Sequence, residues 1–490
     1  TLPHMAAVKH HSYTIAPRLF SNPLSKVFWI LSVIMIGFHL AVLFRVPIPK
    51  LWRIETRYTY LWLSSVFGLG LVTLFLTWKE QVAWWTEGQG FSLKRSAPHL
   101  VLALLASIWV GTHVPPKYRM LADEQSHLSV AQAFYHYGRA ERCVEAHYFD
   151  RSLHCEKFEN EIRPKTYPLT LSFIYSFLGE NLRWTFWFNF ALYLLVGFIL
   201  ARITREATAL TGAALFTQAA WYLWPLNAWW ARAAGYEMTY CFWLSLCFAT
   251  SLAYGQILAG DHFADGSQKV KMLSLQIFLA VVAALAIQTR PDALLSVGIT
   301  LLPAVAPLLL DAKAESRTRG GLFAAILLAA IYPWSMLRGA LREWDMDVIP
   351  KGAPPFSLDA FSRNIYPNLD VVMNLSGDWP SSQTLVLFGL AGVFVGLFGF
   401  TANKRLRLVT VTTTLWLAAV FGVFTAFQHG RMNIAVSMRY ATCLYPALSV
   451  LAGVTGASIL RRFAQHHWGA GLLVAVCIIL MISHAPVIED

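Results

Sequence analysis

Asp123 and Glu124 stand side by side where a helical spacing of apolar residues begins. A carboxylate in such a place can act as the general base that accepts a proton from a hydroxyl group. It can equally be an acidic helix start that suits the positive end of the helix dipole and has no further role. The spacing leaves both explanations open. It also predicts an amphipathic helix on a membrane surface, whose apolar face is made by Leu121, Leu128, Ala131, Phe134 and Tyr135.

Basic residues and further carboxylates follow at intervals, between long apolar runs. Lysine and arginine bind anions well near a helix start, and beside lipid the anion would be a lipid phosphate. The competing explanation is an interfacial anchor, whose long side chain only reaches toward water. Two of these charges flank Pro291 with almost no loop, where burial costs on the order of 3 kcal/mol, so they are usually paired or functional. The candidate substrate-binding residues are Arg163, Lys165, Arg232, Glu237, Arg290, Asp292, Arg431, Arg439 and Tyr440.

Two of the six cysteines, Cys143 and Cys155, lie in one polar segment. They are candidates for a disulfide if that segment faces an oxidising compartment, and otherwise they are two free thiols. The other four lie within apolar runs and are expected to be packing residues. No Cys-x-x-Cys pair occurs, so a metal site built on cysteine pairs is not supported.

The elements that position these residues must lie in a membrane. Of the 490 residues, 56% are apolar and 13% are charged, which is about half the charge of an ordinary soluble domain. The mean hydropathy of +0.49 excludes a soluble domain, a disordered chain and a disulfide scaffold. An all-α polytopic membrane protein remains. The net charge of +12 then belongs to cytoplasmic loops, and no nucleic-acid partner is expected.

About 13 apolar runs have the roughly 20 residues that a helix needs to cross a bilayer. A further run, 166–180, is short and holds Pro168 and Gly179, so we expect a re-entrant or surface helix there. The predicted spans are 27–46, 59–78, 97–114, 183–203, 208–225, 237–256, 272–289, 293–311, 321–338, 383–401, 408–427, 440–459 and 469–485.

Basic loops set the expected orientation, because membrane proteins collect lysine and arginine on the cytoplasmic side. A cytoplasmic N-terminus places nearly all the basic loops on that side, and only loop 47–58 disagrees. We therefore expect three parts: an N-terminal tail with three spans over 1–114, a large periplasmic loop with surface helices over 115–182, and the remaining spans over 183–490. The last part includes the periplasmic segments 339–382 and 428–439.

Four short elements occur in order across about residues 120–446. The first is the Asp123–Glu124 pair. The second, Arg163-Pro164-Lys165-Thr166-Tyr167-Pro168-Leu169, is similar to the Lys-Pro-Pro-Leu-Tyr-Pro element of protein mannosyltransferases and lipid A aminoarabinose transferases. The third runs from Arg232 to Glu237, where those families have Arg-x-x-x-x-Asp, and the fourth is Arg439-Tyr440 followed by Pro446. Together they resemble the GT-C superfamily of polyprenyl-phosphate-dependent glycosyltransferases, although two extra spans precede the acidic pair.

The resemblance implies a membrane glycosyltransferase that moves a sugar from a polyprenyl-phosphate-linked donor to a glycan, lipid or protein acceptor. Transfer would be a single inverting displacement with Asp123 as the base and the cations holding the leaving phosphate. No cofactor is required, although Asp123 and Glu124 could bind a divalent cation. The expected location is the bacterial inner membrane, with the active site on the periplasmic side.

Two other functions share part of this pattern. A flippase or transporter for lipid-linked glycans would also have 12 to 14 spans and charges within the membrane. It would not need a 68-residue outer loop with an acidic helix, and no inverted repeat is visible. An O-antigen-type polymerase would use outer-face arginines and a lipid phosphate in the same way. A purely structural membrane protein fits the buried charges least.

Overall fold

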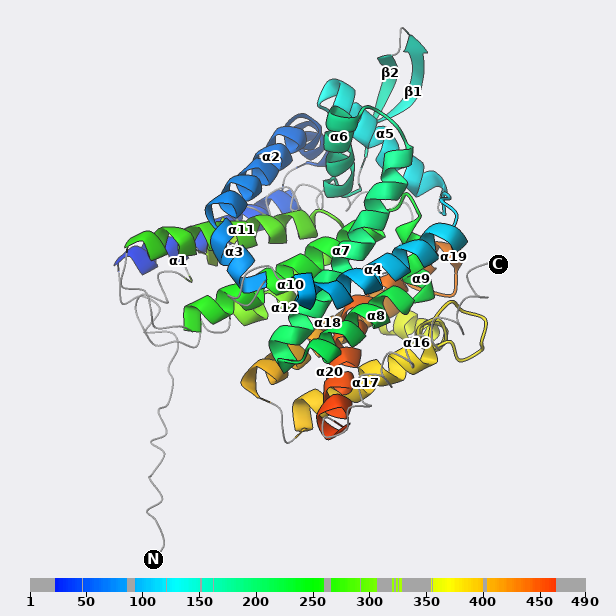
Figure 1. Cartoon of the computed structure of the whole chain (residues 1–490). Helices are drawn as coiled ribbons and strands as arrows, with labels where there is room; N and C mark the ends of the chain where they lie inside the picture. The colour runs from blue at the N-terminus through cyan, green and yellow to red at the C-terminus, as the bar shows by residue number, and fades with distance from the viewer. Residues whose placement is uncertain are drawn as a thin grey trace, which may run out of the picture.

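The structure is a computed structural model. It describes residues 23–463 except 46, 86–92, 120, 150–151, 162, 260–265, 291, 355, 400–402 and most of 306–353. The described chain is mostly helical, as Figure 1 shows. Its helices are α1 (Pro23–Arg45), α2 (Ile48–Leu76), α3 (Trp78–Trp85), α4 (Leu93–His113), α5 (Leu121–Tyr137), α6 (Thr166–Leu178), α7 (Arg183–Thr208), α8 (Thr211–Leu223), α9 (Pro225–Ala231), α10 (Glu237–Ala259), α11 (Gly266–Ile287), α12 (Ala293–Thr300), α16 (Leu358–Met373), α17 (Gln383–Phe398), α18 (Lys404–Ala426), α19 (Ala435–Thr442) and α20 (Tyr445–Phe463).

Five stretches of helix within the described residues are long and apolar enough to cross a membrane. They correspond to five of the predicted spans, and three shorter apolar helices fall on the predicted spans 27–46, 272–289 and 383–401. The membrane character of the fold is therefore confirmed, while the count of about 13 stays a prediction. The span 469–485 and most of 321–338 lie outside the described residues. The five spans are Thr56–Leu76, Ser96–His113, Arg183–Thr208, Lys404–Ala426 and Ser437–Arg462.

The predicted span 208–225 corresponds to the short helix α8, and a second short helix follows it. Helix α8 has 13 residues and ends before Pro225, which opens α9. Proline has no backbone N–H and fixes its own φ, so it starts a new helix more readily than it continues one. Thirteen residues rise only about 20 Å, less than the roughly 30 Å of a bilayer core.

The segment 115–182 is not all helical, which corrects the all-α prediction. A two-stranded antiparallel hairpin, β1 (Glu141–Phe149) and β2 (Ser152–Asn160), follows α5 and projects beside α5 and α6 at the top of Figure 1. A register shift after Cys143 interrupts the pairing, so the alternation that would mark a strand is broken in the sequence. Cys143 and Cys155 form a disulfide across the hairpin.

Helix α5 is a buried helix, which corrects the prediction of an amphipathic helix lying on a membrane surface. Its buried residues cover most of its circumference, and the helix packs on α6 and β1. The short run 166–180 forms helix α6 as expected, and Tyr167, Leu171 and Tyr175 pack with Leu128 and Ala131 of α5. The element that carries Asp123 is therefore held by protein on several sides.

The bundle has two polar ends, joined by α7. At its start, Asn189 Nδ2 donates to the carbonyl of Gly235, just before α10 (2.7 Å). Near its end, Glu206 accepts from Arg405 Nη1 at the start of α18 (3.0 Å), and the carbonyl of Thr208 accepts from Arg461 Nη2 of α20 (2.9 Å). The 26 residues of α7 rise about 39 Å. The basic residues near its end thus lie far from Asp123, and we call the two regions the basic end and the site end.

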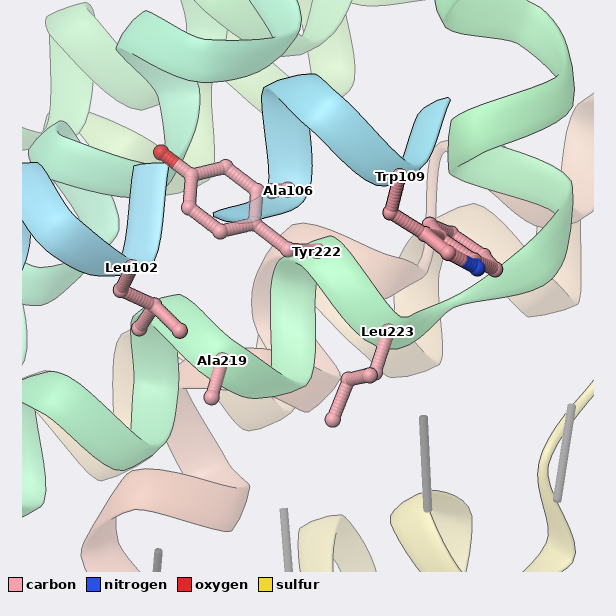
Figure 2. Close-up of a pocket in the computed structure, with 6 residues that line it drawn as sticks. All are labelled: Leu102, Ala106, Trp109, Ala219, Tyr222 and Leu223. Carbon is pink, nitrogen blue, oxygen red and sulfur yellow. The ribbon is translucent and has the colours of Figure 1, made fainter. Parts of the chain in front are cut away.

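An apolar pocket lies between α4 and α8 (Figure 2). None of its lining residues is among the charged candidates, and Tyr222 directs its hydroxyl to the carbonyl of Leu194 (2.7 Å). The pocket is therefore not the place where the candidate chemistry gathers. It is lined by Leu102, Ala106, Trp109, Ala219, Tyr222 and Leu223.

Candidate active site

Asp123 lies in the first turn of α5 between two guanidinium groups. Arg163 Nη2 donates to Oδ1 at 2.5 Å, and Arg439 Nη2 donates to Oδ2 at 2.9 Å. Burial alone would raise the pKa of Asp123, but the charges of Arg439 and Arg163 outweigh it and hold that pKa below its ordinary value. Asp123 is therefore a carboxylate at neutral pH, with one cation on each oxygen.

The turn between β2 and α6 positions Arg163. Glu161 Oε1 accepts from both the backbone N–H and Nη1 of Arg163, each at 3.0 Å. Lys165 is buried, and its ammonium donates to the carbonyls of Glu161 and of Arg163, the latter at 2.7 Å. These bonds stabilise the turn that places Arg163 beside Asp123. Lys165 therefore has a positioning role here, whereas the sequence suggested that it binds substrate.

Arg439, near the start of the last described span, bridges two carboxylates. Besides Asp123, its Nη1 lies 3.5 Å from Oε1 of Glu237, the first residue of α10. Glu237 is 1% exposed, and among the described residues neither of its oxygens has a hydrogen-bond partner. The Nε of Arg439 is likewise buried without a partner there. The guanidinium of Arg439 therefore connects α5, α10 and α19, and its Nε–H is still available as a hydrogen-bond donor.

Arg290 lies among aromatic rings beside Arg439. Its Nε donates to Asp292 at 2.9 Å, while its Nη1 is buried without a partner among the described residues. The Arg290 guanidinium carbon lies 5.6 Å from the Tyr236 ring centroid and 5.1 Å from that of Tyr440, and Arg439 lies at 5.5 and 5.6 Å from the same two rings. The two arginines thus share two tyrosines, and each keeps one unpartnered N–H.

Three predicted residues make contacts away from Asp123, Arg290 and Arg439. Glu124, unlike its neighbour, accepts from the backbone N–H of Ala234 (2.9 Å) and ties α5 to the turn before α10. Arg232 lies over the ring of Trp187, 5.1 Å from its centroid. Arg431 is exposed and donates from Nε to Asn433 (2.8 Å).

The donor set around Asp123 does not fit a divalent cation. Both of its oxygens face guanidinium groups, and the Glu124 carboxylate accepts from a backbone N–H elsewhere. No group of three or more His, Cys, Asp or Glu side chains that could hold a metal occurs within the described part of the chain. A divalent cation such as Mg²⁺ or Ca²⁺ is coordinated by several oxygen atoms that converge on one point. We therefore derive no step through a metal.

Sequence reasoning missed three members of the site. Glu161 orders Arg163, Tyr236 lies between the two buried arginines, and His127 lies one helical turn after Asp123. The spacing of His127 carried a signal, because residues four apart share one face of a helix. Glu161 was overlooked although its partner Arg163 is only two residues away. Tyr236 gave no signal, because the two arginines that it meets come from distant segments.

Comparison with solved structures places this arrangement in a known fold. The crystal structure of the oligosaccharyltransferase of Archaeoglobus fulgidus in the apo form superposes with a TM-score of 0.50, at 11% sequence identity and over 81% of this chain. The chain therefore shares the fold of this enzyme. It spans little more than half of that enzyme, 56% of its length. The likeness to the oligosaccharyltransferase is one of architecture.

Two further structures resemble the chain at lower scores. The same archaeal enzyme in complex with an inhibitory peptide and a dolichol-phosphate gives a TM-score of 0.48 at 12% identity, over 82% of this chain and 56% of that one. ArnT from Cupriavidus metallidurans in the apo state gives 0.46 at 17% identity, over 77% and 63%. No family model matches the sequence, and no curated protein matches it.

Proposed function

We propose that this chain is a glycosyltransferase of the GT-C type that moves a sugar from a polyprenyl-phosphate-linked donor to an acceptor hydroxyl. The observation that carries the proposal is the placement of Asp123, ionised and half-buried, beside arginines drawn from three distant parts of the chain. A base for the acceptor and cations for the leaving group are the two requirements of this reaction.

Arg290 and Arg439 are the proposed phosphate clamp. They share the rings of Tyr236 and Tyr440, and each has a buried N–H without a partner among the described residues. Charge-assisted hydrogen bonds from guanidinium to phosphate are strong, and a dry setting strengthens them further. The proposed clamp has fewer residues than the sequence suggested. Lys165 donates to the backbone of its own turn, and Arg232 lies over Trp187.

The proposed step is one displacement at the anomeric carbon. The acceptor oxygen forms its bond to that carbon on the face opposite the phosphate, and the bond from the carbon to the phosphate oxygen breaks with its electron pair. Asp123 accepts the proton of the acceptor hydroxyl. Arg290 and Arg439 stabilise the charge that grows on the departing polyprenyl phosphate. Configuration is inverted, and neither ATP nor a nucleotide sugar takes part.

The two polar ends support a site on the outer side of the membrane. The basic end carries Arg202, Arg405 and Arg461, and such residues collect on the cytoplasmic side. The site end lies at the other end of α7. We therefore place the reaction on the periplasmic face of a bacterial inner membrane, with a cytoplasmic N-terminus and a glycan, lipid or protein acceptor.

The Asp123→Asn variant tests the assignment of the base. Asparagine keeps the size of the side chain but cannot accept the proton, so transfer should fall roughly 10²- to 10⁴-fold. Release of polyprenyl phosphate from sugar-loaded lipid in proteoliposomes is measured by mass spectrometry. Asp378→Asn, an exposed carboxylate outside the cluster, is the matched control and should transfer normally. Near-normal turnover by Asp123→Asn would refute the role of this residue.

A further inference from the structure

His127 is a buried residue for which the proposed step has no use. It lies four residues after Asp123 on α5 and is 1% exposed. Its ring meets the rings of Tyr167 and Tyr236 edge to face, with centroids 5.7 and 4.9 Å away. Neither ring nitrogen has a hydrogen-bond partner among the residues that the structure describes. Buried polar groups are nearly always paired, so two unpaired nitrogens on one ring need an explanation.

Structural packing does not explain this histidine. A phenylalanine would fill the same space between two tyrosines without leaving polar atoms unpaired, and each such atom costs about 1–3 kcal/mol when it is buried. Two other buried or half-buried histidines are paired. On the same helix, His136 Nε2 lies 2.8 Å from Oε2 of Glu180. In α4, His99 Nδ1 lies 2.5 Å from Oε1 of Gln218.

A phosphate is not the missing partner either. Burial lowers the pKa of His127 to about 3, so the ring is neutral at physiological pH. A neutral imidazole has one N–H donor and one acceptor nitrogen. A phosphate has only acceptor oxygens for it, whereas a sugar offers neighbouring hydroxyls that both donate and accept.

We propose that His127 is a specificity-determining residue that binds hydroxyl groups of the transferred sugar. Cβ atoms four residues apart on a helix lie about 5–6 Å from each other, so His127 reaches the ring of a sugar whose anomeric carbon faces Asp123. The inference rests on the proposed function, because it needs a sugar in the site of Asp123. It goes further in naming the group that recognises the sugar and in separating that group from the phosphate clamp.

Binding of lipids with and without sugar tests the assignment. The purified protein in nanodiscs is titrated with undecaprenyl phosphate, undecaprenyl-phosphate glucose and undecaprenyl-phosphate mannose. His127→Phe should bind the sugar-free lipid as the wild type does and should bind at least one sugar-loaded lipid roughly tenfold more weakly, because hydrogen bonds to the sugar are lost. His127→Gln, which keeps a donor and an acceptor, should recover part of that loss.

Two control variants separate a loss of sugar recognition from a loss of stability and from a loss of phosphate binding. His136→Phe removes a paired histidine from the same helix and should lower the melting temperature without changing the preference for sugar-loaded lipid. Arg439→Lys should weaken binding of all three lipids alike. His127→Phe should melt at or above the wild-type temperature, since it removes buried polar atoms that have no partner.

The outcomes distinguish this inference from the function on which it rests. If His127→Phe binds every lipid as the wild type does, or loses all three equally, His127 does not recognise the sugar, while the proposed function stands. If the wild type binds none of the three lipids, the polyprenyl-phosphate donor itself is refuted, and the inference falls with it.

Discussion

Asp123, Arg439 and Glu237 behave as one unit, because a single guanidinium holds both carboxylates. Glu237 is fully buried, so its charge is tolerated only while a cation faces it. Any change to Arg439 therefore affects stability as well as donor binding. A simple alanine replacement would mix the two effects.

Three variants of Arg439 separate binding from stability. Arg439→Ala should destabilise the protein by about 3–5 kcal/mol, because it leaves a buried charge without a partner. Arg439→Lys should keep most of the stability and lose activity at least tenfold, since an ammonium cannot span two carboxylates as a guanidinium does. Adding Glu237→Gln to Arg439→Ala should restore stability but not transfer. Thermal unfolding and the transfer assay measure these effects, and full activity of Arg439→Lys would contradict the clamp.

The pH profile tests the electrostatics of Asp123. Its pKa lies below the ordinary 3.8, so its carboxylate stabilises the fold above that pH, and the contribution is lost as the pH falls through the lowered value. The melting temperatures of the wild type and Asp123→Asn should differ by a constant amount above about pH 5 and converge below about pH 4. Convergence already near neutral pH would show that Asp123 is not held ionised by its two arginines.

At the scale of elements, the hairpin braces the helix that carries the site. Ser129 of α5 accepts from the backbone N–H of Cys143 (2.9 Å) and donates to its carbonyl (2.8 Å). Cys143 also forms the disulfide with Cys155 that joins the two strands. The backbone N–H of Cys155 also donates to the hydroxyl of Tyr137 on α5 (2.8 Å), whereas exposed ion pairs such as Lys157 with Glu145 add little.

Removing the bridge should therefore cost stability more than chemistry. The double variant Cys143→Ser/Cys155→Ser should be less stable by roughly 3 kcal/mol, the expectation for a loop of this length. Its transfer rate at low temperature should stay within a few-fold of the wild type. Mass mapping of a non-reduced digest checks the pairing itself. Two alkylatable thiols at these positions in the native protein would contradict both the bridge and an oxidising location.

At the scale of the whole molecule, the separation of the two polar ends predicts the topology. Asp378 follows α16 and Arg407 lies in the first turn of α18, and both are exposed. In a background with Cys477→Ser, a membrane-impermeant maleimide should label Asp378→Cys on intact cells. Arg407→Cys should be labelled only after the membrane is opened. The reverse pattern would place the site on the cytoplasmic side.

The membrane class, the helical elements and the partition of basic residues could be predicted from the sequence, because each depends on local composition. An apolar run of about 20 residues needs no distant partner to become a helix in lipid. Local patterns also failed in identifiable places. The predicted span 208–225 is a helix of only 13 residues, and the register shift after Cys143 hid a hairpin.

The site itself was decided by tertiary structure. All four residues of the site were candidates from the sequence: Asp123, Arg163, Arg290 and Arg439. Their spacing did not predict that Arg439 would contact Asp123 while Arg232 would lie over Trp187. Charges within an apolar bundle must find partners wherever packing places them, and those partners come from segments far apart in the chain. The sequence by itself therefore determined that this protein lies in a membrane and carries unusual charges. Only the packing of α5, α10 and α19 decided which of those charges form a site.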